Sequence, residues 1–280
     1  MAVWKNRFAA HLGLRAPDLP LFLHLGGEAD PVAQVELLAD LGFAGVQDNF
    51  LTLRTPEVQA RIGDTIARRG MVMGSFVHDP LNWNRPCWSG EAADLDRAFE
   101  TTLAAAQRSG SRRVNCVTGF DSTRSRADQL LVMGRNLRRA ADRAAKAGIM
   151  LCVEVTNPAY LPGMLIESLD EAVRLIDALD HPGVRLMFDT GHLAMNGEHL
   201  PAIIKIHARR IGAVQVADVS LDGATRVDLG AGKLDWPPIL RALRDIGYGG
   251  LLEVEHQPLE DSREGEVALL ARLRAVDARG

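Results

Sequence analysis

The sequence has few aromatic residues, few cysteines and no block of basic residues. Aromatic side chains make up 5% of its 280 residues, and the formal net charge is -4. A nucleic-acid-binding groove normally needs clustered Lys and Arg, so the sequence argues against a nucleic-acid partner. No apolar run approaches the roughly 18 residues that cross a bilayer, which argues against a membrane partner as well.

Only three cysteines are present, and they cannot all pair with one another. Cys116 and Cys152 lie within apolar runs and are expected to be reduced core residues, whereas Cys87 lies in a polar loop. Residues 1–7 include charged positions with no uninterrupted apolar segment after them, which is a poor signal peptide. These features predict a cytoplasmic protein.

The chain does contain a repeated unit, in which a helical stretch ends on a glycine and an apolar run follows. The glycines are Gly42, Gly70, Gly110, Gly148, Gly183, Gly212 and Gly247. The apolar runs after them are Phe43–Gln47, Met71–Phe76, Val114–Val117, Ile149–Val153, Val184–Phe188, Ala213–Val216 and Leu251–Val254. A glycine suits the left-handed residue that ends a helix, and short continuous apolar runs suit parallel strands buried on both faces.

The first strand needs no preceding glycine because no helix comes before it. We place it at Leu21–Leu25, directly after Pro20. Eight such strands without a Ser/Gly-rich linker predict a single-domain α/β protein, a (β/α)8 TIM barrel. The barrel is expected to span about residues 20–277, with residues 1–19 as an N-terminal extension.

Two helix starts support this division of the chain. Asp30 precedes Pro31, and Asp235 precedes Trp236-Pro237, so each aspartate is expected to cap a helix that has proline in its first turn. The alternative fold is an open doubly wound sheet, which would carry a G-x-G-x-x-G loop after its first strand. The segment from His24 to Glu28 lacks that spacing, so the closed barrel is favoured.

Polar residues recur where the predicted strands end. In chain order they are Gln47-Asp48, His78-Asp79, Asn115, Glu154, Asp189, Gln215 and Glu255. The last four come from consecutive strands and carry oxygen ligands. Neighbouring strands lie about 5 Å apart, and active sites of TIM barrels form at the C-terminal strand ends, so these side chains are expected to converge.

Each of these residues also has a structural interpretation. A structural Glu154 would lie in solvent or pair with an arginine, and a structural Asp189 would only cap the next loop. We favour function because perturbed acids concentrate at active sites. Glu253 and Glu255 are two residues apart and point to the same face of their strand, so the alternation of side chains along a strand cannot distinguish them. Glu255 lies nearer the strand end and is preferred. Gln215 is a weaker candidate, because a buried glutamine often only satisfies backbone groups.

Three carboxylates and an amide oxygen form a hard ligand set, which favours one Mg²⁺ or Mn²⁺ ion over zinc. His192, which follows Asp189, is close enough in sequence to reach the same site. In the loop after the third strand, Trp83 and Trp88 form either an apolar wall of the site or a packed loop over the rim. Asp218 and Asp228 lie in a long polar loop and are expected to be solvated.

At these positions the sequence resembles the xylose-isomerase-like sugar isomerase/epimerase superfamily, and within it the hydroxypyruvate isomerase branch. The resemblance runs from about Gly42 to Pro258. Its most specific segments are Val114–Cys116, Glu154 with Asn157, Phe188–His192, Val214–Ala217, Gly230–Trp236 and Gly247–Gly250 leading to Glu255–Pro258. In that family the residues matching Glu154, Asp189, Gln215 and Glu255 bind the metal, and the two glutamates are the acid/base pair. The resemblance therefore selects Glu255 over Glu253.

The chain also departs from the family pattern. Gln47 stands where many relatives have a glutamate, Val155 replaces a proline, and Gln215 stands where related epimerases have a histidine. The loop from Val77 to Trp88 does not match the usual loop of the branch. These differences leave the proposed metal site in place and bear on which substrate it takes.

The resemblance implies a 1,2-proton shift on a small hydroxy-carbonyl substrate through an enediolate, with Glu154 and Glu255 as acid and base. The substrate is a ketose, a sugar acid or a hydroxypyruvate-like compound, and the candidate substrate contacts are His192, His78, Asn115 and Trp83. A homo-oligomer is possible. The alternatives are an inosose-type dehydratase on the same metal site and a sugar-binding barrel without turnover. An apurinic endonuclease ranks lower, because it would need several zinc ions and a basic surface.

Overall fold

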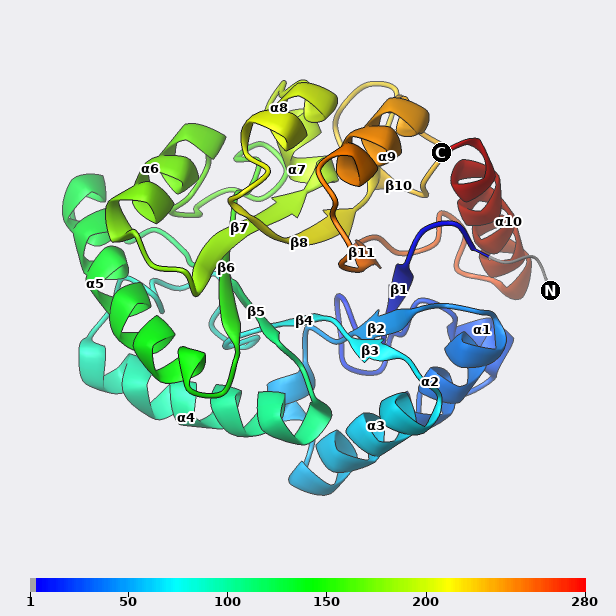
Figure 1. The fold of residues 1–280 in the computed structure, drawn as a ribbon, viewed down its shortest axis with the longest axis horizontal. Coiled ribbons are helices and arrows are strands. Elements are labelled where there is room, and N and C mark those ends of the chain that lie inside the picture. Colours follow the sequence, from blue (N-terminus) through cyan, green and yellow to red (C-terminus); the bar gives the residue numbers. More distant parts are fainter. Residues whose placement is uncertain (1–3) are drawn as a thin grey trace.

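A closed ring of parallel strands forms the centre of the computed structural model, which describes residues 4–280 (Figure 1). The hydrogen-bonded order is β3-β2-β1-β11-β8-β7-β6-β5-β4. Only Gly74 separates β3 from β4, so these two are halves of one strand and close a ring of eight strand positions within the described residues. The strands are β1 (Phe8–His11), β2 (Gly45–Gln47), β3 (Val72–Met73), β4 (Ser75–Val77), β5 (Arg113–Cys116), β6 (Met150–Glu154), β7 (Val184–Asp189), β8 (Ile211–Val216) and β11 (Leu252–Val254). The predicted TIM barrel is confirmed.

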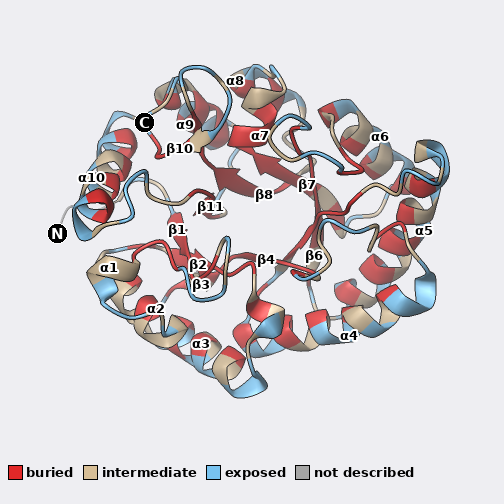
Figure 2. Ribbon diagram, turned by 180° about the vertical axis from the view of Figure 1, so that it is seen from behind, coloured by how far each residue is buried: buried red, intermediate tan, exposed pale blue. Residues whose placement is uncertain are grey.

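The helices surround this ring. They are α1 (Leu23–Gly26), α2 (Pro31–Asp40), the 3-10 turn η1 (Leu51–Leu53), α3 (Pro56–Arg68), α4 (Ala92–Ser109), α5 (Arg126–Ala145), α6 (Leu169–Leu179), α7 (Thr190–Met195), α8 (Leu200–Ile206), α9 (Trp236–Asp245) and α10 (Arg263–Arg279). A small antiparallel hairpin, β9 (Asp218–Val219) and β10 (Arg226–Val227), interrupts the loop after β8. Figure 2 shows the strands buried and the helices turning their exposed faces outward, so the core lies between the two layers.

The predicted first strand is wrong. The structure places β1 at Phe8–His11, where it pairs in parallel with β2 and β11, and Leu23–Gly26 forms α1. Leu21–Leu25 is the more apolar run, but a barrel strand is defined by hydrogen-bonding partners on both sides. The barrel therefore begins at Phe8, inside the segment that was predicted to be an N-terminal extension. The backbone N–H groups of Lys5 and Asn6 donate to Asp277 of α10 and hold the start of β1 in place.

The other seven predicted strands all form. Five of the seven glycines, among them Gly42 and Gly110, have the positive φ expected after a helix. Gly183 and Gly212 do not: α6 ends instead on Asp180, at a φ of 43°, and Gly212 lies inside β8. A Cβ on Gly212 would meet the Sδ of Met150 at 2.7 Å, so close packing requires glycine there.

The predicted helix start at Asp30 is confirmed, because its Oδ1 accepts from the N–H of Val32 over 2.7 Å. Asp235 occupies the corresponding position before α9 but accepts no capping hydrogen bond. All three cysteines are free, as expected for Cys116 and Cys152. Across residues 4–280, every helix is too short or too polar to span a bilayer.

Candidate active site

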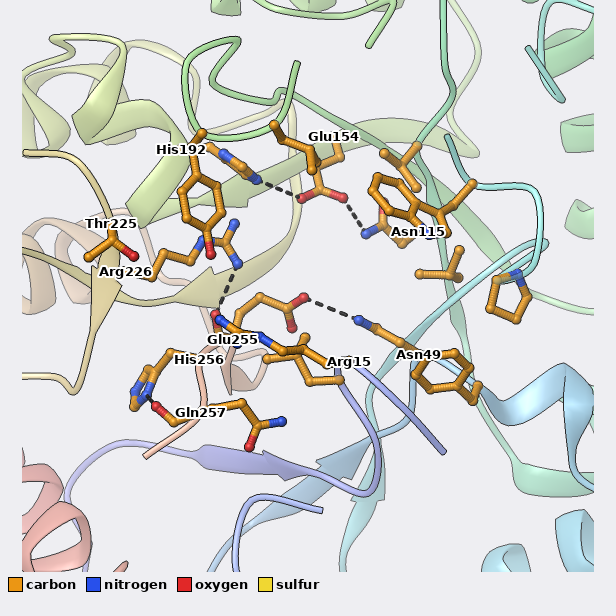
Figure 3. Close-up of a pocket in the computed structure, with 18 of the residues that line it drawn as sticks. Arg15, Asn49, Asn115, Glu154, His192, Thr225, Arg226, Glu255, His256 and Gln257 are labelled. Atoms are coloured by element: carbon orange, nitrogen blue, oxygen red, sulfur yellow. Dashed lines mark hydrogen bonds and ion pairs between the residues drawn. The ribbon is translucent and has the colours of Figure 1, made fainter. Parts of the chain in front are cut away.

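A cavity of about 550 Å³ opens at the C-terminal ends of the strands. Loops that follow most of the barrel strands contribute to its lining (Figure 3). The predicted site residues on its surface are Trp83, Asn115, Glu154, His192 and Glu255. This is the end of a TIM barrel where active sites form.

The two glutamates reach the cavity from different sides of the barrel. Glu154 ends β6, and its Oε2 accepts from Asn115 Nδ2 over 2.6 Å. Glu255 follows β11 directly; its Oε1 accepts from Asn49 Nδ2 over 3.2 Å, and its Oε2 accepts from Gln47 Nε2. Figure 3 shows the two carboxylates on opposite sides of the cavity. Amide donors therefore orient both acids without neutralising them.

Burial changes the acidity of both glutamates. Loss of water around Glu154 and the nearby charge of Asp189 raise its pKa to about 7, against the lowering effect of Arg226. Burial likewise raises the pKa of Glu255 to about 8; Arg226 opposes this shift, and Glu154 adds to it. A carboxyl group that titrates near neutral pH can both take up and give back a proton at that pH, which suits general acid/base chemistry.

Asp189 and Gln215 lie side by side on β7 and β8, fully buried beneath the cavity lining. Asp189 Oδ1 accepts from the N–H of His192 over 2.8 Å. Neither the oxygen nor the nitrogen of the Gln215 amide has a hydrogen-bond partner among the described residues. An unsatisfied buried polar group costs about 1–3 kcal/mol. This orphaned amide oxygen beside a carboxylate fits a hard divalent cation.

Ligand atoms of Glu154, Asp189 and His192 lie within 4.8 Å of one another. His192 Nδ1 accepts from the N–H of Asn157 over 3.0 Å, and burial lowers the pKa of His192 well below its usual value. The neutral ring must then carry its hydrogen on Nε2, and a protonated nitrogen cannot bind a metal. Nε2 lies 3.8 Å from Glu154 Oε1. His192 therefore presents an N–H hydrogen-bond donor to the site and not a nitrogen that can bind a metal ion. Glu255 is not part of this close group.

The site contains a guanidinium group that the sequence did not reveal. Arg226, on β10, donates to Asp189 Oδ2 over 2.7 Å and to the backbone carbonyl of Glu255 over 2.9 Å. Its position depends on how the long loop after β8 folds back over the barrel, and the sequence pattern does not show that. Asn49 was missed for the same reason: it lies beyond the end of β2, where only the packed loop brings it to Glu255.

Two residues of the loop from Val77 to Trp88 lie away from the main cavity. His78 Nδ1 pairs with Thr102 Oγ1 at 2.8 Å, and the ring lines a separate cavity of about 240 Å³. Trp88 is fully buried, with its ring 4.7 Å from that of His78 and 6.1 Å from that of Phe99. Of the two interpretations of the tryptophans, the cavity wall holds for Trp83 and the packed loop for Trp88.

The expectation that Asp218 and Asp228 are solvated is wrong, because both are fully buried. Each carboxylate is surrounded by donors that offset the cost of its burial. The donors to Asp218 are the N–H groups of Val219, Gly230 and Leu234 and the indole of Trp236, while Asp228 accepts from Leu259 N–H and pairs with Arg272. The two aspartates therefore fasten the long loop after β8 to its surroundings.

The structure also separates Glu253 from Glu255. Both oxygens of Glu253 accept from Ser75, one from its N–H over 2.9 Å and the other from its hydroxyl. Glu253 does not line the cavity, whereas Glu255 does. The glutamate at the cavity is the one that the sequence favoured.

Comparison with known proteins agrees with this architecture. The sequence profile described as the xylose isomerase-like TIM barrel matches residues 35–273. The chain belongs to this family. It is 23% identical to the hydroxypyruvate isomerase of Escherichia coli (strain K12) over 270 residues, which cover 92% of this chain and 96% of that protein. It is 29% identical to the 2-oxo-tetronate isomerase of Pectobacterium atrosepticum, with coverages of 92% and 95%.

A solved structure of this xylose isomerase-like fold is also similar. The protein from Brucella melitensis described as AP endonuclease, family 2, superposes with a TM-score of 0.81 at 25% identity. The superposition covers 96% of this chain and 99% of that one. The two relatives named above are isomerases, which supports an activity of the isomerase or epimerase kind.

Proposed function

We propose that this protein is a divalent-metal-dependent isomerase or epimerase that moves a proton on a small hydroxy-carbonyl substrate. The observation that carries the proposal is the pair of buried glutamates, Glu154 and Glu255, on opposite sides of one cavity. Both have a pKa raised toward neutrality, and both are held by amide donors. A binding protein needs no matched acid/base pair, so the arrangement favours catalysis.

Glu154, Asp189, Gln215 and Glu255 would hold the ion, and their oxygen atoms favour Mg²⁺ or Mn²⁺. The unpartnered amide of Gln215 supports this assignment. When bound, a divalent ion polarises the substrate carbonyl and stabilises the negative charge that develops on oxygen. His192 is not included among the ligands, because its Nε2 carries the hydrogen.

The protein residues account for the proton movement. One glutamate removes the proton from the hydroxyl-bearing carbon. In an isomerisation a proton returns to the neighbouring carbon, while the hydroxyl oxygen loses its proton to become the new carbonyl and the former carbonyl oxygen gains one. In an epimerisation the other glutamate returns the proton to the opposite face of the same carbon. The Nε2–H of His192 donates to a substrate oxygen, and Asn115 keeps the Glu154 carboxylate oriented. Trp83 forms part of the wall that excludes water from the reacting carbons.

The relatives support a substrate that is a ketose, a sugar acid or a hydroxypyruvate-like compound, since they are named as isomerases of hydroxypyruvate and 2-oxo-tetronate. An endonuclease activity is less well supported. The described residues offer one close group of three metal-ligating side chains, and the chain has a net charge of -4. A nuclease of that kind would need several zinc ions and a basic surface.

Exchange of substrate hydrogen in deuterated water tests the proposal. The Mn²⁺- or Mg²⁺-loaded protein is incubated with a panel of small ketoses and hydroxy-keto acids, and deuterium at the carbon beside the carbonyl is followed by NMR. We expect exchange with at least one compound and its loss in the presence of a chelator. Glu100→Gln, on α4 outside the barrel, is the matched control and should exchange normally. A compound that instead loses water identifies a dehydratase, and binding without exchange identifies a non-catalytic barrel.

A further inference from the structure

The loop after β1 carries a second arginine at the cavity. Arg15 is exposed and lines the cavity, and Figure 3 shows its side chain on the same side as Asn49 and Glu255. Arg226 is held by Asp189 and by the carbonyl of Glu255. By contrast, no hydrogen bond or ion pair to Arg15 is formed within residues 4–280. Its guanidinium is therefore free to bind a ligand.

The two arginines at the cavity differ in their surroundings. The charge of Arg226 is offset directly by Asp189, whose Oδ2 accepts from its guanidinium over 2.7 Å. Arg15 has no carboxylate partner among the described residues, so its positive charge is left for a negatively charged group of a ligand.

The position of Arg15 shows where that negative charge belongs. Arg15 is exposed at the mouth, whereas Glu154 and Glu255 are 8% and 5% exposed. The cavity volume of about 550 Å³ lies in the range of pockets for drug-sized ligands, well beyond a three-carbon compound. A substrate that fills it would place its reacting carbons at the glutamates and its other end near the mouth.

We propose that Arg15 binds an anionic oxygen group at the end of the substrate farthest from the reacting carbons. This proposal rests on the proposed function, because it places the hydroxy-carbonyl end at the glutamates. The substrate would be a ketose that carries a terminal carboxylate or phosphate. A guanidinium matches either group with paired N–H donors. Hydroxypyruvate, whose carboxylate adjoins its carbonyl, would leave Arg15 without a partner.

Matched ligands test this assignment by binding alone. Dissociation constants of D-fructuronate, D-fructose 6-phosphate and D-fructose, and of the corresponding stereoisomeric sets, are measured by calorimetry on the Mn²⁺-loaded protein. We expect an anionic member to bind at least about tenfold more tightly than its neutral counterpart. Arg15→Gln should abolish that preference without changing the affinity for the neutral ketose. Arg15→Lys should retain part of it, because a lysine keeps the charge but not the paired donors.

Arg61→Gln is the control, since Arg61 is exposed on α3 and does not line the cavity. The anion that shows the larger Arg15-dependent gain identifies the carboxylate or the phosphate. The proposal is overturned if no anionic ligand in the panel binds wild type more tightly than Arg15→Gln. It is also overturned if Arg15→Gln weakens the neutral ketoses equally.

Hydrogen exchange separates this proposal from the proposed function. If Arg15 gives an anionic preference but no ligand exchanges hydrogen in deuterated water, the anion site stands and the reaction is wrong. If neutral ketoses exchange as fast as their acids in both wild type and Arg15→Gln, the reaction stands and the anion site is wrong.

Discussion

The guanidinium of Arg226 donates to Asp189 Oδ2 over 2.7 Å, so a cation already neutralises part of the acidic site. A divalent ion bound by Asp189 would lie next to this positive charge and be repelled by it. We expect Arg226→Met to increase Mn²⁺ affinity by at least about tenfold, since like charges at such distances repel by a few kcal/mol. Arg226→Lys should stay near wild type. A Mn²⁺ titration followed by EPR measures both, and weaker binding in Arg226→Met would contradict the repulsion.

Replacing Gln215 should lower the metal affinity without lowering the stability of the metal-free protein. Gln215→Leu removes an unpartnered buried polar group, so the metal-free protein should be as stable as wild type or more stable by about 1 kcal/mol. Metal affinity should fall, because an oxygen ligand is lost. Asn136→Leu is the control: the Asn136 amide donates to the carbonyls of Trp88 and Gly90, and its loss should cost about 1–3 kcal/mol. Thermal unfolding with and without Mn²⁺ distinguishes the two.

Replacing Asp189 is a second test of the proposed metal ligands. Wild type should bind one Mn²⁺ or Mg²⁺ per chain, and Asp189→Ala should lose the ion, because its fully buried carboxylate lies within 4.8 Å of a ligand atom of Glu154. Metal analysis of the purified variants gives the answer. Wild-type affinity in Asp189→Ala would show that the ion binds elsewhere.

Substitution of the two glutamates tests the proton transfer itself. Glu154→Gln and Glu255→Gln keep an oxygen at each position but remove the base, so the expected loss of rate is about 10²–10⁴-fold. Each variant must first be shown to be folded and to hold metal. Exchange in deuterated water should then fall in at least one of them. Wild-type exchange and turnover in both would rule out the mechanism.

The glutamates also predict how stability depends on pH. Burial raises the pKa values of Glu154 and Glu255 to about 7 and about 8 in the folded protein, from about 4.5. The folded state then binds more protons than the unfolded state, so their contribution to stability is complete below about pH 4.5. It is lost as the pH rises through about 7 and 8. The metal-free protein should therefore unfold at a lower temperature at pH 9 than at pH 6.

The double variant Glu154→Gln/Glu255→Gln should show a smaller change in unfolding temperature over the same range. Metal binding displaces these protons, so the apparent Mn²⁺ affinity of wild type should rise between pH 6 and pH 8. A slope of stability against pH that is identical in wild type and the double variant would show that these residues are not its source.

The two tryptophans of the loop from Val77 to Trp88 should behave differently. Trp83 lines the cavity, so Trp83→Ala should change kcat/KM about 5–10-fold with little effect on unfolding. Trp88 is fully buried, and Trp88→Ala should destabilise the fold by about 3–5 kcal/mol. Kinetics and thermal unfolding of both variants at constant metal content provide the comparison. Equal effects of the two changes on kcat/KM would contradict this division.

The barrel was predictable because its repeated unit is local. Gly42 and Gly110 end helices in the left-handed conformation, and an apolar run follows each one. The sequence failed where a partner distant in the chain decides the structure. Phe8–His11 becomes a strand because β2 and β11 pair with it on both sides, and these four residues lack the preceding glycine by which the other strands were predicted.

The candidate site shows the same contrast between features set by the local sequence and features set by segments distant in the chain. Glu154, Asp189, Gln215 and Glu255 could be placed near one another because the ends of parallel strands converge in a barrel. Arg226 lies on β10 and Arg15 on the loop after β1, and only the packed structure brings their guanidinium groups to the cavity. Asp218 and Asp228 were misjudged for the corresponding reason, since their donors come from distant segments.

The pairing of β1 with both β2 and β11 affects how the chain folds while it is being synthesised. One edge of β1 can be covered early by β2, but its other neighbour is the last strand of the barrel. That edge therefore has no native partner until residues 252–254 have left the ribosome, and an open strand edge is a site for pairing between chains. Asp277, which fixes Lys5 and Asn6, emerges later still. The native surroundings of β1 are thus complete only after α10 has been synthesised.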